Sequence, residues 1–103
     1  MGYYTDFNLT HDNPELDNES VAQVLYEISG YRFPSDLQLN EARWYEWAKD
    51  MKRLSSRYPD TLFTLHGSGE EKGDLWVAYF RADKMQIAEA VITLAPFDPS
   101  LLK

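Results

Sequence analysis

The segment Thr64–Trp76, which reads TLHGSGEEKGDLW, holds the densest group of side chains that could do chemistry. It sets one histidine, two adjacent glutamates and an aspartate among three glycines, between two apolar runs. Phosphate-binding loops, metal sites and acid–base pairs of carboxylates all use such residues. A plain turn between two strands uses them as well, because glycine readily adopts the positive φ angles of turns.

A phosphate-binding loop is excluded by the residues on the C-terminal side of the glycines. Such a loop presents backbone N–H groups at a helix N-terminus, but here the glycines lead into the strand-like run that begins at Leu75. Glu70 and Glu71 would in addition repel a phosphate group. The segment is therefore better explained as a turn.

A metal site has more in its favour, because nitrogen and oxygen donors are present. The available donors are His66, Glu70, Glu71 and Asp74. Their spacing is not that of an EF-hand, and nothing in the sequence obliges them to converge. We therefore expect no metal and no cofactor, and we keep a metal-dependent enzyme built on this loop only as a third alternative.

Catalysis finds little support elsewhere in the chain. There is no cysteine, there are only two histidines, and no serine lies on a strand-turn-helix elbow. The pair Glu70–Glu71 is weak evidence for acid–base chemistry, since a chain with 17 acidic residues forms adjacent pairs by chance. We predict no catalytic residues and a protein that is not an enzyme.

The overall charge argues against direct contact with nucleic acid. Seventeen acidic residues against ten basic ones give a net charge of −7, which repels phosphate backbones. No run approaches the roughly 18 apolar residues of a membrane span, and residues 1–10 lack the pattern of a signal peptide. The absence of cysteine fits a reducing compartment. We expect one domain over residues 1–103, no membrane contact and a cytoplasmic location.

The first half of the chain predicts a strand followed by a helix. Period-two alternation of apolar residues favours a strand over Tyr3–Thr10. Ser20 and Gln23 have the spacing of a capping box, so a helix is predicted to begin there and to end at Gly30. The stretch Tyr31–Leu39 fits either a short edge strand or a loop.

The strongest helical pattern covers Glu41–Arg57, with Asn40 as its N-cap. In this prediction Asp50 faces water on the polar side of the helix. The apolar stripe comprises Trp44, Trp47, Ala48, Met51, Leu54 and Tyr58.

Three further strands are predicted in the second half, over Thr61–His66, Leu75–Arg81 and Met85–Leu94, with a tight turn at Ala82–Lys84. The resulting order β-α-α-β-β-β is typical of an α+β fold. We expect a two-layer sandwich in which two helices cover one face of an antiparallel sheet of about four strands.

Two finer predictions concern the C-terminal part. The small side chain of Ala88 is expected to face the helices, which would leave Ile87 on the open face of the sheet. In the segment APFDPSLLK, the side chains of Phe97 and Leu101 are expected to pack back onto the domain.

Several aromatic residues fall outside the apolar stripes. The core is expected to take Trp44, Trp47, Phe63, Trp76 and Phe80. Tyr45 and Tyr79 are predicted on the surface, where a tyrosine is either a neutral surface residue or an anchor for a partner, because it offers both a ring and a hydroxyl. Exposed aromatics on a sheet also suggest RNA-base stacking, but the acidic surroundings disfavour it.

The sequence from residue 43 onward, RWYEWAKDMKRLSSRYPDTLFTLHGSGEEKGDLWVAYFRADKMQ, resembles small proteins encoded by bacteriophages and mobile elements. The shared pattern is W-Y, D-M, a serine, Y-P-D, L-F-x-L, G-x-G-E-E, G-D-x-W and Y-F. It falls here on Trp44, Tyr45, Asp50, Met51, Ser55, Tyr58, Pro59, Asp60, Leu62, Phe63, Leu65, Gly67, Gly69, Glu70, Glu71, Gly73, Asp74, Trp76, Tyr79 and Phe80. The resemblance implies a phage or mobile-element origin, hence the cytoplasm of a bacterial host, and it brings no catalytic residues.

Taken together, the sequence predicts a small acidic protein-binding module. By analogy with other small acidic phage proteins, it is expected to inhibit a host defence or nucleic-acid-handling protein through that protein's basic surface. The partner-binding residues are predicted to be Glu70, Glu71, Asp74, Tyr45 and Tyr79. The alternative is a homo-oligomeric structural or regulatory phage protein, for instance a homodimer, that uses the open face of its sheet.

Overall fold

The computed structural model describes residues 3–71, 73–90 and 96–102 of the chain. Its helices are α1 (Asn18–Ser29), α2 (Trp47–Arg57) and the short 3-10 helix η1 (Pro99–Leu101). Its strands are β1 (Thr5–His11), β2 (Gln38–Ala42), β3 (Phe63–Gly69), β4 (Leu75–Arg81) and β5 (Lys84–Glu89). In the part of the chain so described, neither α1 nor α2 combines the length and apolar character needed to cross a membrane.

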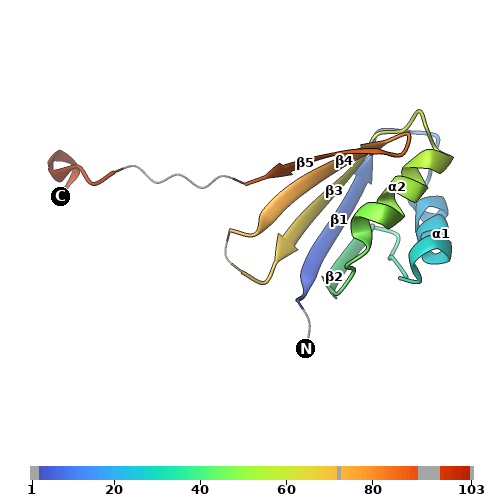
Figure 1. The fold of residues 1–103 in the computed structure, drawn as a ribbon, viewed down its shortest axis with the longest axis horizontal. Coiled ribbons are helices and arrows are strands. Elements are labelled where there is room, and N and C mark those ends of the chain that lie inside the picture. Colours follow the sequence, from blue (N-terminus) through green and yellow to red (C-terminus); the bar gives the residue numbers. More distant parts are fainter. Residues whose placement is uncertain (1–2, 72, 91–95, 103) are drawn as a thin grey trace.

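The strands form one antiparallel sheet in the order β2-β1-β3-β4-β5 (Figure 1). The α+β class with two α-helices and an antiparallel sheet is thereby confirmed. The sheet has five strands where about four were expected, because an edge strand, β2, forms from the end of the stretch that sequence left open together with residues 40–42, which were predicted as the cap and start of the second helix. The chain order is β-α-β-α-β-β-β.

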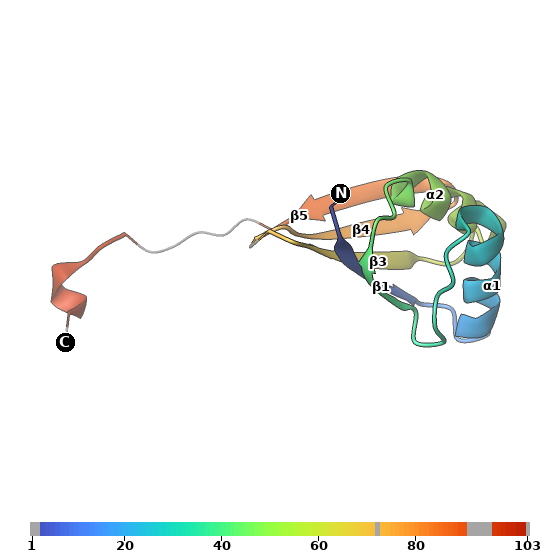
Figure 2. The same cartoon turned by 90° about the horizontal axis from the view of Figure 1, so that it is seen from below.

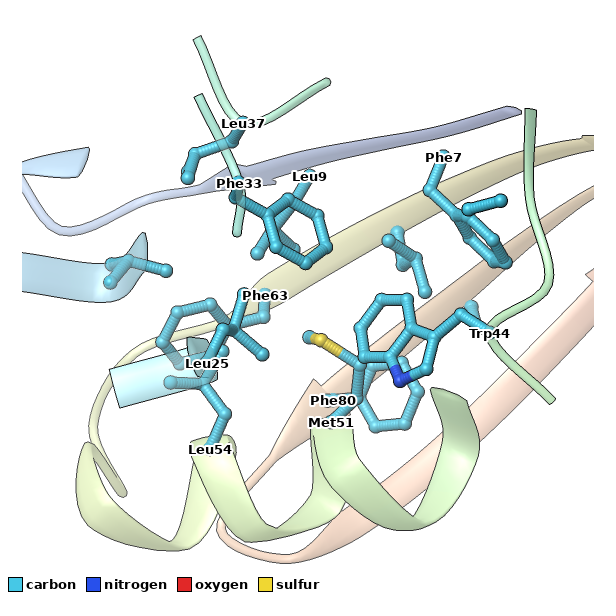
Figure 3. Close-up of a cluster of buried hydrophobic side chains, with 14 residues drawn as sticks. Phe7, Leu9, Leu25, Phe33, Leu37, Trp44, Met51, Leu54, Phe63 and Phe80 are labelled. Carbon is cyan, nitrogen blue, oxygen red and sulfur yellow. The ribbon is translucent and has the colours of Figure 1, made fainter. Parts of the chain in front are cut away.

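Both α-helices contribute to a single hydrophobic core on one face of the sheet (Figure 3). Val21 and Leu25 come from α1, and Met51 and Leu54 come from α2; all four are fully buried. The sheet contributes alternate residues of its three central strands, as the period of two requires. These residues are Phe7, Leu9, Phe63, Leu65, Ala78 and Phe80.

The predicted cap of α1 is wrong by a few residues. The N-cap is Asp17, whose carboxylate accepts a hydrogen bond from the backbone N–H of Ser20 at 2.7 Å. This bond from Ser20 holds the pKa of Asp17 below its ordinary value. At the other end the prediction is confirmed, since Gly30 caps the helix with φ of 81°.

The predicted start of α2 is also wrong, because Asn40 to Ala42 belong to β2 and the helix begins at Trp47. Trp44 nevertheless is buried, at 3% exposure, and reaches the core from the connection that precedes the helix. It lies three positions before Trp47, so its spacing imitates a helical stripe.

Asp50 is buried rather than water-facing, at 7% exposure. Its carboxylate accepts a hydrogen bond from the indole N–H of Trp44 at 2.7 Å. A buried carboxylate needs such a partner, so the bond from Trp44 explains how this polar residue of α2 can be buried.

The β4–β5 hairpin has the predicted tight turn. Ala82 and Asp83 both have positive φ, at 49° and 69°, which is the geometry of a two-residue type I′ turn. The strand β5 ends at Glu89, and the predicted extension over residues 91–94 lies outside the described residues. The predicted orientation of β5 is wrong: Ile87 pairs with the core residue Ala78 and so lies on the helix side of the sheet, which places Ala88 on the open face.

The two apolar side chains near the C-terminus do not pack back onto the domain. Phe97 and Leu101 are 77% and 68% exposed, which contradicts the prediction that they join the core. Figures 1 and 2 both show η1 standing apart from the sheet and the helices.

Candidate functional site: the acidic end of the sheet

The segment that carries the candidate chemistry is the connection between β3 and β4, as the turn interpretation predicted. The N–H of Gly69 donates to the carbonyl of Asp74 at 2.9 Å, and the N–H of Asp74 donates to the carbonyl of Glu71 at 3.1 Å. Gly73 adopts a positive φ of 84°. The loop is therefore closed by its own backbone.

Tyr3, which precedes β1, fixes one side of this loop. Its hydroxyl donates a hydrogen bond to the Asp74 carboxylate and accepts one from the N–H of Glu71 at 3.2 Å. The bond to Asp74 is the main reason that the pKa of the Tyr3 hydroxyl is raised. A Cβ on Gly69 would overlap both groups, so glycine is required for this contact.

Tyr4 connects the loop to the other side of the sheet. Its N–H donates to the Glu70 carboxylate at 2.8 Å. Its ring lies 4.5 Å below the Arg43 guanidinium, which also donates to the Tyr4 hydroxyl. Tyr45 lies two residues after Arg43, and its hydroxyl accepts a hydrogen bond from the N–H of Tyr3 at 3.0 Å. Loops that are far apart in sequence thus meet around the start of β1, as Figure 1 shows.

A hollow of about 350 Å³ lies where these loops meet around the start of β1. Its lining residues are Tyr4, Asp6, Glu41, Ser68, Gly69 and Glu70. One carboxylate oxygen of Asp6 accepts a hydrogen bond from the N–H of Glu41 at 2.7 Å. The side chains of Glu41 and Glu70 are exposed, so the hollow presents negative charge to solvent. We call this region, from Tyr3 to Asp6 together with Glu41 and the Glu70–Asp74 loop, the acidic end.

The structure divides the predicted partner-binding residues into two groups. Bonds to Tyr3 and Tyr4, just before β1, bring together four of them at or beside the acidic end: Glu70, Glu71, Asp74 and Tyr45. Tyr79 does not join them. It is 37% exposed on the open face near the opposite end of β4, where it pairs with Thr64 on β3 and Gln86 on β5.

Sequence reasoning missed Tyr3, Asp6, Glu41 and Arg43 as members of this site. Asp6 lies within the predicted first strand, but alternation gave no reason to connect it with the glutamates of a distant loop. Glu41 and Arg43 were assigned to a helix, which hid their place beside β1.

A second hollow lies on the open face and has a volume of about 620 Å³. Its β1 and β2 side is polar, with Asn8 and Gln38 among its lining residues, whereas its β4 and β5 side is apolar. Leu75 is 49% exposed there, so the open face is partly apolar, as expected for a surface that a partner could cover.

Within the described ranges, no three histidine, aspartate or glutamate side chains are grouped so that they could hold a metal ion. Comparisons with protein families, with curated proteins and with solved structures gave no match.

Proposed function

We propose that this chain is a non-enzymatic protein-binding module that docks its acidic end on a basic surface of a partner protein. In the setting that the sequence resemblance suggests, the chain is a phage-encoded inhibitor of a host defence or nucleic-acid-handling protein. The observation that carries the proposal is the fixed position of the acids around the first strand.

Preorganisation supports this proposal over a neutral, solvated loop. Glu70 and Asp74 are each held by a hydrogen bond to the segment before β1, so less side-chain entropy is lost when a partner binds. Tyr45 lies beside them and is 64% exposed, which makes its ring available as an anchor. Tyr79 is left out of this surface by its position.

The test replaces Glu70, Glu71 and Asp74 by their amides, which removes three charges but keeps an acceptor oxygen for Tyr3 and Tyr4. We expect an unchanged melting curve and a strong loss of captured protein when the variant is used as bait in a bacterial lysate. Capture by the wild type should weaken as salt rises, because exposed charges are screened over about 8 Å at physiological ionic strength.

The matched control removes the same charge elsewhere, with amides at Glu15, Glu19 and Asp60, all of which are exposed. It should capture the same partners as the wild type. Equal losses in both triple variants would mean that only net charge matters, and capture that is insensitive to salt and to the first variant would refute the proposal.

The alternative function is homo-oligomerisation through the open sheet face, and the exposed Leu75 beside Val77 in the second hollow favours it. Val77→Lys would place a charge in that hollow. Dissociation of an oligomer by this variant, with no effect of the amide variants on binding, would favour the alternative.

A further inference from the structure

The strand β5 is an edge that carries a charge at each end but, from Lys84 to Glu89, neither a bulge nor a proline. All six of its residues are exposed, and it pairs with β4 in unbroken register from Arg81↔Lys84 to Trp76↔Glu89. Natural edge strands are usually blocked by a bulge, a proline or a covering segment, because an open edge pairs with other strands. Among the described residues, Figures 1 and 2 show no segment lying along the outer side of β5.

The register determines which backbone groups of β5 are free. In a hairpin with a two-residue turn, the residues that flank the turn form a hydrogen-bonded pair, and such pairs recur at every second residue. The N–H of Ala90 donates to the carbonyl of Leu75 at 2.9 Å, which fits this pattern. The backbone groups of Met85, Ile87 and Glu89 therefore point away from β4, toward the free edge.

The side chains of the same residues lie on the helix side of the sheet and are only partly covered. The helix α2 packs along β4: Trp47 stacks on Trp76 at 4.3 Å, and the Ser55 hydroxyl accepts a hydrogen bond from the N–H of Asp83 at 3.0 Å. One strand further out, Met85 and Ile87 remain 38% and 45% exposed. Free backbone groups and partly exposed apolar side chains thus coincide on β5.

We infer that β5 pairs antiparallel with β5 of a second copy of this chain, with Ile87 on the two-fold axis. This register joins Ile87 to Ile87 of the second copy and Met85 to Glu89 of the second copy, so every free backbone group of these residues is used. The two sheets become continuous, and the exposed Ile87 side chains meet on the helix side. This inference is independent of the proposed function, since it involves no residue of the acidic end.

Charge complementarity favours antiparallel pairing of two copies of β5. The strand begins beside Arg81 and Lys84 and ends at Glu89. Antiparallel pairing sets the basic start of each strand at the same end of the pair as Glu89 of the other copy, with Lys84 on the open side and Glu89 on the helix side of the sheet. A parallel arrangement of the two copies would instead place Lys84 near Lys84 and Glu89 near Glu89, which is unfavourable.

The experiment uses the absence of cysteine from the chain, so that one introduced cysteine can crosslink only between copies. Ile87→Cys places two cysteines opposite each other in a hydrogen-bonded pair, with Cα atoms about 5.5 Å apart, which suits a disulfide. Met85→Cys is the matched control, because Met85 has similar exposure on the same face. The two copies of Met85 lie four positions apart along the strands, roughly 13 Å.

Under mild oxidation we expect a covalent dimer of Ile87→Cys and at least about tenfold slower crosslinking of Met85→Cys, since the disulfide tolerates only short Cα separations. Sedimentation should show a wild-type dimer, a folded Ile87→Lys monomer with an unchanged circular dichroism spectrum, and a Gln86→Lys dimer. A wild-type monomer at the highest soluble concentration, or equal crosslinking of the two cysteine variants, would overturn the inference.

Discussion

The two edges of the sheet are built in opposite ways. Along β2, one residue of β1 faces two of β2 between the pairs Thr5↔Ala42 and Phe7↔Leu39, so the ladder is broken by a bulge. Glu41 has a positive φ of 51° at this bulge, and the Asp6 carboxylate accepts its N–H. The edge formed by β5 has a regular ladder and, from Lys84 to Glu89, no such device.

This difference indicates separate uses for the two edges. An irregular strand cannot serve as a template for pairing, so the β2 side can carry fixed charges without the risk of aggregation. The acidic end lies on this side, with Glu41 contributing to its hollow. The regular β5 side keeps its backbone groups available, which is what pairing with a second copy requires.

The largest expected effect concerns the β2 side, where Trp44 comes shortly after the edge strand. Trp44→Ala should lower the free energy of unfolding by about 3–5 kcal/mol, because it leaves a cavity and deprives the buried Asp50 of its partner. Urea denaturation measures this change in the free energy of unfolding. Trp47→Ala is the control and should cost less, since Trp47 is only partly buried. A larger effect at Trp47 would contradict the assignment of Trp44 as the anchor of this side.

An intermediate effect is expected at the β5 side, in the turn of the hairpin. The left-handed conformation of Ala82 costs about 1–2 kcal/mol relative to a residue that tolerates it. Replacing Ala82-Asp83 by Asn-Gly should therefore raise the urea midpoint by an amount equivalent to about 1 kcal/mol, with an unchanged slope. If the substitution lowers the midpoint, the turn does not have this geometry in solution.

The smallest effect is a proton equilibrium at the acidic end. Because its hydroxyl donates to the Asp74 carboxylate, Tyr3 should ionise at a pKa above the ordinary value of 10.0. The stability from this bond is present while Tyr3 is protonated and is lost as pH rises through the raised pKa. Asp74→Asn should shift the pKa of Tyr3 downward, as measured by NMR with labelled tyrosine. An unchanged pKa would show that the bond does not form in solution.

The sequence predicted the elements with local signals and failed where the signal was tertiary. β4 matches its predicted bounds, Leu75–Arg81, because its apolar run ends directly at the two-residue turn of Ala82 and Asp83. β2 was missed, because its first two residues fell in the undecided stretch and its last three in the predicted helix and its cap. Its pairing with β1 joins residues 30 to 37 positions apart, and the contact between Glu41 and Asp6 joins residues 35 positions apart.

The same distinction holds for the candidate site. Glu70 and Asp74 were found from composition and spacing, since they are neighbours along the chain. Their bonds to Tyr3 and Tyr4 arise only once β1 pairs with β3, and no local pattern encodes that pairing. The orientation of Ile87 was predicted wrongly for a related reason: alternation defines two faces of a strand but does not say which face the helices cover.

The difference between the two edges is tested most directly by residue-resolved amide hydrogen exchange, measured at low and high protein concentration. The account predicts that the amide of Ile87, which points away from β4, becomes protected as the concentration rises. The amide of Glu41, bonded to Asp6 within one copy, should show the same protection at both concentrations. Fast exchange of Ile87 at every concentration, or protection of Glu41 that also depends on concentration, would contradict it.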